Sequence, residues 1–467
     1  MGSNIFEKIW RMHSIAAIDA DTDLILVDRV LLHERTGGIA LKSLAESGRE
    51  VFAPQQTFVT MDHVVDTRPG RTDETIMPTG KAFITATREA ARAAGLTLFD
   101  LGDPAQGIVH VISPEMAIVL PGATLVCPDS HTCSQGALGA LAWGIGSTAA
   151  EHALASSTLR VKRPKTMRIT IDGTLAAGVT AKDLALHLIA RFGSAGGAGH
   201  IVEYAGEAVT ALDVEARLTL CNMATEFAAF TAIIAPDDKV FAYLEGRRFA
   251  PAGPDWDRAV AAWRELRSDD DAVFDAEYRI HAADVAPMVT WGISPQQAVA
   301  LDGRVPSYDA VAAREPRELY DRALAYMDVA PDMPLLGLPI GAAFIGSCTN
   351  SRLSDLRRAA SILKGRTVAE GVKAICVPGS SRVKAAAEAE GLDRIFVEAG
   401  FEWRESGCSM CFFSGGESFG YRQRVISSTN RNFESRQGPE TRSHLASPET
   451  VAASAIAGMI ADPRTLA

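Results

Sequence analysis

Short apolar runs alternate with amphipathic segments along most of the chain. In one clear example, residues 343–345 form an apolar run and residues 346–351 are predicted to turn. A helix is expected to follow, capped by Ser351 or Ser354 and ended near Gly365. The apolar positions on one face of this helix are Leu356, Ala359, Ala360 and Leu363.

The next segment repeats this pattern. Residues 372–377 are expected to form a strand, a Pro-Gly-Ser-Ser loop follows, and a helix is predicted to end at Gly391. Strands that alternate with helices indicate an α/β fold with mostly parallel sheets and helices on both faces. The loops that leave the carboxyl ends of such strands are the usual place for ligands.

Polar and glycine-rich stretches divide the chain into three predicted α/β domains. A polar break at residues 160–168 suggests a first domain at 1–165. A second domain at 166–284 begins with the predicted strand MRITIDG and contains the turn GSAGGAG. A stretch rich in proline and charge leads into a third domain at 285–467, which carries the grouped cysteines.

Composition narrows the class of protein. The 467 residues are 47% hydrophobic and 22% charged, which is typical of a folded globular chain and excludes a disordered or collagen-like one. We find no apolar run long enough to span a membrane and no apolar leader at the start. The net charge of −11 argues against a nucleic-acid partner. An odd number of scattered cysteines, seven in all, does not suit a disulfide framework and favours the cytoplasm.

Three cysteines carry the strongest chemical signal. Cys348 lies in IGSCTN, and Cys408 and Cys411 lie in GCSMC. Two thiols separated by two residues can reach one metal centre, and a third from another loop leaves one coordination position open, as catalytic metals require. The spacing alone equally suits a redox pair or half of a structural zinc site.

Histidines and carboxylates form a second group. Asp62 and His63 are adjacent, and Asp129 precedes His131 by two positions. An aspartate beside a histidine can fix the imidazole tautomer and raise its basicity, as general acid–base catalysis requires. The group is completed by His110 in GIVHVI and by Asn222 and Glu226 in CNMATE. Each residue by itself is also compatible with an ordinary buried, hydrogen-bonded polar group.

Two arginines form a third group. Arg431 and Arg436 lie in the polar segment SSTNRNFESRQG. The planar guanidinium of arginine suits the binding of carboxylates, although surface ion pairs are a common explanation for such arginines.

These pieces together resemble the aconitase superfamily. The motifs DHxxxT, GIVH, DSHT, CNMxxE, IGSCTNSR, GCSMC and TNRNFExRQG occur in the family's order, and the resemblance runs from Ile5 to the end of the chain. It is greatest to the large subunits of the two-subunit members that act on 3-isopropylmalate. The resemblance implies the aconitase-like α/β fold, with three domains around a central cluster-binding cleft. It also implies one 4Fe–4S cluster per subunit, with Cys348, Cys408 and Cys411 as ligands.

The resemblance also implies roles for the other residues. Asp62 with His63, and Asp129 with His131, would serve as acid and proton relay for the leaving hydroxyl. His110 would pair with Glu226. The amides that would lie beside the cluster are Asn222 and Asn430. The side chains that would contact the substrate are His33, Arg431 and Arg436.

The implied activity is a hydro-lyase reaction on a hydroxy dicarboxylic acid, with 3-isopropylmalate and 2-isopropylmalate of leucine biosynthesis as first candidates. The resemblance further implies a separate small subunit that supplies the catalytic serine. Several positions depart from the family pattern: Pro128, Cys133, Ser134, Gln135, Ala228, Phe230, Ala232 and residues 412–416. These departures leave open a paralogue for another acid, such as a 2-alkylmalate, dimethylmalate, homoaconitate or citrate-like acid. The grouped cysteines are also compatible with a non-catalytic cluster protein or a zinc hydrolase.

Overall fold

The computed structural model describes residues 2–413 and 416–466. Its contacts group into two compact units. The first unit comprises Met1–Val64, Thr79–Thr174 and Gly197–His281, and the second comprises Val65–Pro78, Leu175–Gly196 and Ala282–Ala467. The fold is α/β with several parallel sheets, as predicted. The three-domain division stays a prediction.

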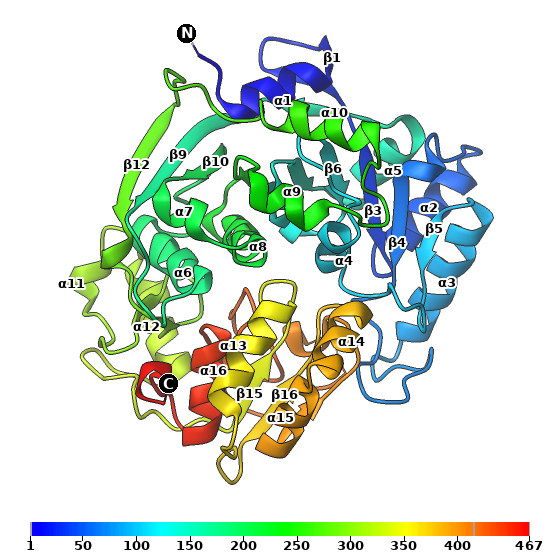
Figure 1. Cartoon of the computed structure of the whole chain (residues 1–467). Coiled ribbons are helices and arrows are strands. Elements are labelled where there is room, and N and C mark those ends of the chain that lie inside the picture. The colour runs from blue at the N-terminus through cyan, green and yellow to red at the C-terminus, as the bar shows by residue number, and fades with distance from the viewer. Residues whose placement is uncertain (1, 414–415, 467) are drawn as a thin grey trace. The chain divides into compact units, whose positions relative to one another are not determined.

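A parallel sheet in the order β5-β4-β3-β6-β7 forms the centre of one part of the first unit (Figure 1). Its strands are Arg29–His33 (β3), Thr57–Thr60 (β4), Thr97–Phe99 (β5), Thr124–Cys127 (β6) and Leu141–Gly144 (β7). Among the strands of this sheet, β3 comes first along the chain, and it lies between β4 and β6. The chain therefore winds outward from β3 in both directions, which places a topological switch point between β3 and β6.

The first unit has two further sheets. One is parallel, in the order β11-β10-β9-β12, and the other is antiparallel, in the order β1-β2-β8. Their strands are Ser14–Ala17 (β1), Thr22–Leu26 (β2), Thr158–Lys162 (β8), Lys165–Asp172 (β9), His200–Ala205 (β10), Thr231–Ile233 (β11) and Ala276–His281 (β12). The stretch predicted as a polar break thus contributes strands β8 and β9.

Local capping explains where several helices of the first unit begin. Asn4, Asp213 and Asp237 each accept a hydrogen bond from a backbone N–H of the first turn that follows them. The α-helices are Ile5–His13 (α1), Gly37–Glu46 (α2), Gly80–Ala93 (α3), Val109–Glu115 (α4), Ser147–Ser156 (α5), Glu207–Ala211 (α7), Val214–Asn222 (α8), Asp238–Leu244 (α9) and Pro254–Trp263 (α10). The 3₁₀ helices are Pro54–Gln56 (η1), Ser130–Leu138 (η2) and Met223–Phe227 (η3).

The second unit is built on a parallel sheet in the order β17-β16-β15-β18-β19, and a small antiparallel pair β13-β14 accompanies it. The strands are Met288–Thr290 (β13), Ala298–Ala300 (β14), Ala342–Ile345 (β15), Lys373–Cys376 (β16), Phe401–Trp403 (β17), Arg424–Ser427 (β18) and Arg442–Leu445 (β19). Strands β15 and β16 confirm the two strands predicted at 343–345 and 372–377. Fully buried apolar side chains such as Phe344, Ile375 and Val425 form the core beside them.

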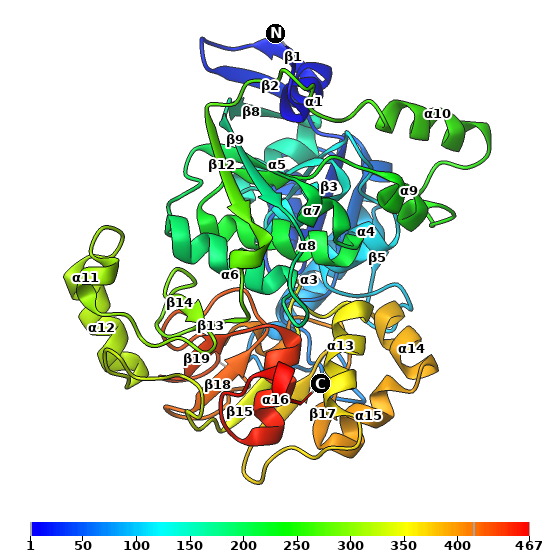
Figure 2. The ribbon, with the colours of Figure 1, turned by 60° about the vertical axis from the view of Figure 1, so that its left-hand side comes forward.

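Helices α13 and α16 pack against each other, and α16 also contacts β15 and β18 (Figure 2). The α-helices of this unit are Ala181–Phe192 (α6), Tyr308–Val311 (α11), Arg317–Met327 (α12), Leu353–Leu363 (α13), Ser381–Ala389 (α14), Leu392–Ala399 (α15) and Pro448–Ala457 (α16). The 3₁₀ helices are Ala282–Asp284 (η4), Ser409–Cys411 (η5) and Pro463–Thr465 (η6). Among the described residues, none of the helices has the length and apolar character needed to cross a membrane.

The helix predicted after residue 351 is α13, but its predicted serine cap is wrong. Arg352 is the N-cap residue, and its backbone N–H donates to Asp355 Oδ2 at 3.1 Å. The Ser351 hydroxyl donates instead to the Ser347 carbonyl at 2.6 Å. Ser351 therefore stabilises the preceding turn, which contains Cys348.

Candidate functional site

In the first unit, one predicted substrate contact and three predicted acid–base residues lie at the carboxyl ends of β3, β4 and β6. His33 is the last residue of β3, Asp62 and His63 follow β4, and Asp129 follows β6. In parallel sheets, ligand sites form outside these strand ends and at the switch point. The switch point between β3 and β6 thus explains how residues far apart in the sequence come together.

The Asp62–His63 pair is formed. His63 Nδ1 lies 2.6 Å from Asp62 Oδ1, and the Val109 N–H donates to Asp62 Oδ2 at 2.8 Å. Burial by itself raises the pKa of the Asp62 carboxyl, but the charge and hydrogen bond of His63 outweigh it and lower that pKa. Asp62 is therefore held ionised.

Asp129 contacts three histidines. Its carboxylate lies 3.2 Å from His63 Nε2 and 2.9 Å from His110 Nε2, and it accepts the backbone N–H of His131 at 2.7 Å. Burial raises the pKa of Asp129, yet the hydrogen bonds from these histidines hold it well below its usual range. Since both ring nitrogens of His63 face ionised carboxylates, and only the imidazolium has two N–H donors, the site favours the protonated form of His63.

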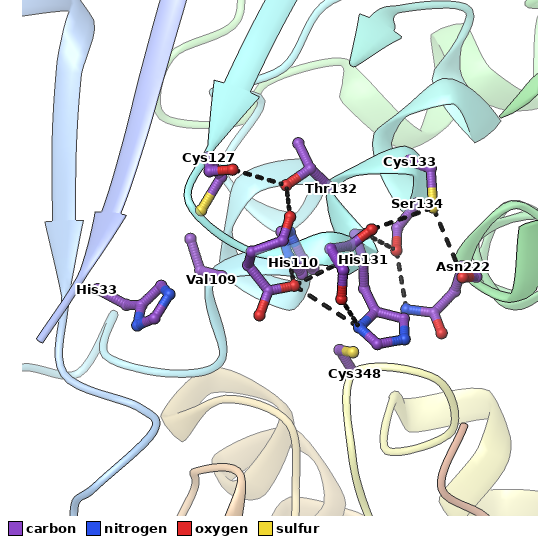
Figure 3. A network of polar contacts seen from close by, with 12 residues as sticks. His33, Val109, His110, Cys127, His131, Thr132, Cys133, Ser134, Asn222 and Cys348 are labelled. Atoms are coloured by element: carbon purple, nitrogen blue, oxygen red, sulfur yellow. Dashed lines mark hydrogen bonds and ion pairs between the residues drawn. The ribbon is translucent and has the colours of Figure 1, made fainter. Parts of the chain in front are cut away.

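The pairing of His110 and His131 with carboxylates differs from the prediction. His131 Nε2 lies 3.1 Å from Glu226 Oε1, whereas His110 pairs with Asp129. The prediction that His110 pairs with Glu226 is therefore wrong, because η2 turns the His131 side chain toward Glu226 and α4 presents His110 to Asp129. Asn222 donates to the Ser134 hydroxyl at 2.9 Å (Figure 3).

His33 lies against His63. The two rings stack with their centroids 3.8 Å apart and their planes 16° apart. Burial, followed by the charge of His63, lowers the pKa of His33 to about 4, so His33 is neutral near pH 7. A neutral ring against an imidazolium avoids placing two buried positive charges in contact.

Three of the positions that depart from the family pattern make defined contacts. The Pro128 carbonyl lies 3.3 Å from His33 Nε2, and Gln135 Nε2 donates to the His110 carbonyl at 3.4 Å. Phe230 stacks on Trp143 with ring centroids 5.8 Å apart. Ser414 and Gly415, within the departing segment 412–416, lie outside the described residues.

One set of residues in this network is close enough to share an ion. Within residues 2–413 and 416–466, ligand atoms of His33, Glu34, Asp62 and His63 all lie within 4.8 Å of one another. However, both Asp62 oxygens and both Glu34 oxygens already face polar hydrogens of the protein. The two imidazoles lie face to face, which does not aim their nitrogens at one point. Hydrogen bonds therefore satisfy the two carboxylates of this set, while His33 Nδ1 is buried without a hydrogen-bond partner among the described residues.

In the second unit, the three predicted cysteines follow strands of the parallel sheet. Cys348 follows β15 after Gly346 and Ser347, while Cys408 and Cys411 lie in the turn of η5 beyond β17. The Cys411 N–H donates to the Cys408 carbonyl at 3.0 Å. All three side chains are buried.

Two residues bridge the sulfurs of Cys348 and Cys411. Ser347 Oγ lies 3.9 Å from Cys348 Sγ and 3.3 Å from Cys411 Sγ. Asn430 Nδ2 lies 3.5 Å from Cys348 Sγ, and its Oδ1 lies 4.0 Å from Cys411 Sγ. The family resemblance implied that Asn430 lies beside the cluster, whereas Ser347 was not singled out. Ser347 has a φ of 78°, a left-handed conformation that is unfavourable for a residue with a Cβ.

Arg436 lies beside the predicted cysteine ligands. Its Nη2 lies 3.6 Å from Cys411 Sγ, and its guanidinium lies 4.9 Å from the centroid of the Phe433 ring. Arg431 is half-buried on the same segment after β18. The structure thus brings Arg436 to the thiols, and a role for either arginine in holding substrate stays a prediction.

The donor set fits an iron–sulfur cluster. The sulfurs of Cys348 and Cys411 lie beside a hydroxyl, an amide and a guanidinium group, which can donate the kind of hydrogen bond that stabilises cluster thiolates. Within the described parts of the chain, these sulfurs do not form a group all within 4.8 Å, as ligands of a single ion would. Burial raises the pKa of Cys376, at the end of β16, well above its usual range, so this thiol stays protonated.

Comparison with known proteins gives a family. Residues 7–458 match the model of the aconitase family (aconitate hydratase). The chain belongs to the aconitase family. Over 465 residues it is 51% identical to "3-isopropylmalate dehydratase large subunit 1" of Bradyrhizobium diazoefficiens, covering 100% of this chain and 97% of that protein. The aconitase-family resemblance seen in the sequence is thereby confirmed.

A solved structure, the holo-form of Thermococcus kodakaraensis aconitase X, matches with a TM-score of 0.47 and 13% identity. It covers 88% of this chain and 84% of that chain.

Proposed function

We propose that this aconitase-family protein is the large subunit of an iron–sulfur hydro-lyase. Its substrate in this proposal is 3-isopropylmalate, converted to 2-isopropylmalate by loss and return of water in leucine biosynthesis. The relative with 51% identity over the whole chain supports the substrate assignment. The observation that carries the proposal is the trio of buried cysteines, two of which share Ser347 and Asn430 as polar neighbours.

Cys348, Cys408 and Cys411 would hold a 4Fe–4S cluster, one per subunit. When bound, the cluster supplies a Lewis-acidic iron without a protein thiolate, at which a hydroxyl and a carboxylate of the substrate can bind. Asn430 and Ser347 orient the sulfurs, and Arg436 offsets part of their negative charge. The Ser347 hydroxyl and the Asn430 amide lie against Cys348, and the Arg436 guanidinium lies against Cys411, so each could donate to a metal-bound sulfur.

The residues of the first unit supply proton transfer in this proposal. His63, whose two ring nitrogens face Asp62 and Asp129, can hold a proton and release it toward a leaving hydroxyl. Asp129, which also contacts His110, can stabilise the cation or accept its proton. Glu226 orients His131 and completes the relay. Arg431 would offer a cation for a substrate carboxylate, since elimination builds negative charge there.

We also propose a separate small subunit as partner, because the related protein is named a large subunit. That subunit would supply the base that removes the proton from carbon, and the complex would act in the cytoplasm. Without it, this chain is expected to hold a cluster but to have little activity.

The proposal is tested by anaerobic reconstitution of the chain with iron and sulfide, alone and with a cognate small subunit. Broad visible absorption, about four irons per chain, and interconversion of the isopropylmalates by the pair are expected. Parallel assays with dimethylmalate, homoaconitate and citrate separate this substrate from related acids. Full activity without iron, or one equivalent of zinc without sulfide, would refute the proposal.

A further inference from the structure

Glu34 is a buried carboxylate that the proposed chemistry does not use. It follows His33 at the end of β3, and its side chain is 0% exposed. Its backbone carbonyl accepts the Thr87 hydroxyl of α3 at 3.1 Å, which ties this position to a second element. A buried acid is costly unless its oxygens are satisfied, so the contacts of this side chain indicate why it is present.

Both Glu34 oxygens accept backbone N–H groups that flank His63. Oε2 accepts from Asp62 at 2.9 Å, and Oε1 accepts from Val64 at 2.5 Å. The two bonds fix the backbone on either side of His63. Since the His63 ring must face Asp62 and Asp129 at once, its orientation depends on this backbone.

A glutamine could not replace this carboxylate. Its amide has one acceptor oxygen, and its NH₂ group would face a second N–H donor. Only an ionised carboxylate accepts on both oxygens at full strength. The requirement for two acceptors therefore explains why a negative charge is buried next to the negative charge of Asp62.

We infer that Glu34 is a positioning residue, whose carboxylate clamps the peptide units around His63 and so holds the imidazole between Asp62 and Asp129. The clamp itself is independent of the reaction, whereas its importance for catalysis rests on the proposed function.

The clamp should depend on pH. Burial, followed by the charge of Asp62, raises the pKa of Glu34 to about 7, although His63 acts in the opposite direction. The charged or titratable groups that face Glu34 are Asp62 and His63 on the loop after β4, and His33 on its own strand. As pH falls through about 7, Glu34 takes up a proton and loses one acceptor, so the clamp weakens.

Hydrogen exchange of the backbone amides tests the clamp without relying on activity. In the full-length reconstituted chain, Glu34→Gln should speed exchange in the peptide that contains residues 62–64 about tenfold, because one charge-assisted hydrogen bond is lost. Glu50→Gln is the matched control, since Glu50 is exposed, and it should leave this peptide unchanged. Unchanged exchange in Glu34→Gln would overturn the inference.

The unmodified chain provides a second measurement that needs no variant. After correction for the intrinsic pH dependence of exchange, protection of residues 62–64 should fall as pH is lowered from 8 to 6, whereas a flat profile would overturn the inference. With the small subunit present, Glu34→Gln should lower kcat about tenfold with little change in KM and unchanged visible absorption. If the pair has no hydro-lyase activity at all, the proposed function fails, while the exchange data still decide on the clamp.

Discussion

The two five-stranded sheets have the same strand order but carry different chemistry. In each, the first strand lies centrally, two strands follow on one side, and two follow on the other. At the strand ends of the first unit, imidazoles pair with carboxylates. At those of the second unit, thiols are surrounded by a hydroxyl, an amide and a guanidinium. One set is held together by hydrogen bonds between charged side chains, and the other has the donor atoms that fit a metal group.

The largest effect is expected from a change at the cysteines of the second unit. Cys348→Ser should abolish the visible absorption after reconstitution and lower activity more than about a hundredfold, because even changes around metal ligands cost ten- to a hundredfold. Cys376→Ala in β16 is the control and should keep its absorption. Retention of a full cluster by Cys348→Ser would contradict the ligand assignment.

The next largest effect is expected from a change at the paired histidines and carboxylates of the first unit. Asp129→Asn removes the carboxylate that faces His63 and His110 and should lower kcat about 10²- to 10⁴-fold. The iron content should stay unchanged, as measured by metal analysis. A parallel loss of iron and activity would show that the two sets of residues are not separable.

A third effect concerns the pH dependence of stability, which we expect to arise from a buried histidine of the second unit. His444 is buried between the Thr290 carbonyl and Arg424, at 2.6 Å and 2.9 Å. Burial, followed by the charge of Arg424, lowers its pKa to about 3. Below about pH 6.5 the unfolded chain gains a proton there that the folded chain does not, so stability falls as pH decreases, by about 1.4 kcal/mol per pH unit.

Urea unfolding midpoints at pH 5 and pH 7 measure this effect. His444→Gln should reduce the difference between the two midpoints, whatever its effect on stability at pH 7. His281→Gln alters an exposed histidine and should leave the difference as it is. An equal pH difference in His444→Gln and the unmodified chain would rule out this histidine as the cause.

The smallest effect concerns a departure from the family pattern in the first unit. Ala228 ends η3 with a φ of 58°, in the left-handed region that favours glycine. Ala228→Gly should raise the free energy of unfolding by about 0.5–1 kcal/mol, as measured by denaturant titration. Ala229→Gly, at a neighbouring position without a positive φ, should not stabilise the protein.

The sequence predicted those features that are local in the chain. Strand β15, its turn and α13 follow from one apolar run and one amphipathic segment, and the Asp62–His63 contact joins adjacent residues. The contacts of Glu34 and the pairing of His110 with Asp129 were not predicted, because they join segments brought together by strand order. No residue pattern in a single sequence specifies which loops will meet.

Ser347 shows what the thiol site demands of its backbone. A glycine at this position would adopt the same φ without steric conflict but would offer no hydroxyl, and an alanine would keep the conflict and still offer none. Serine adopts this unfavourable backbone conformation, and its hydroxyl oxygen lies near two sulfurs at once. The loop before Cys348 is therefore less stable than it would be with glycine at position 347. A glycine there would raise the stability of the fold but would remove the hydroxyl that lies beside the two sulfurs.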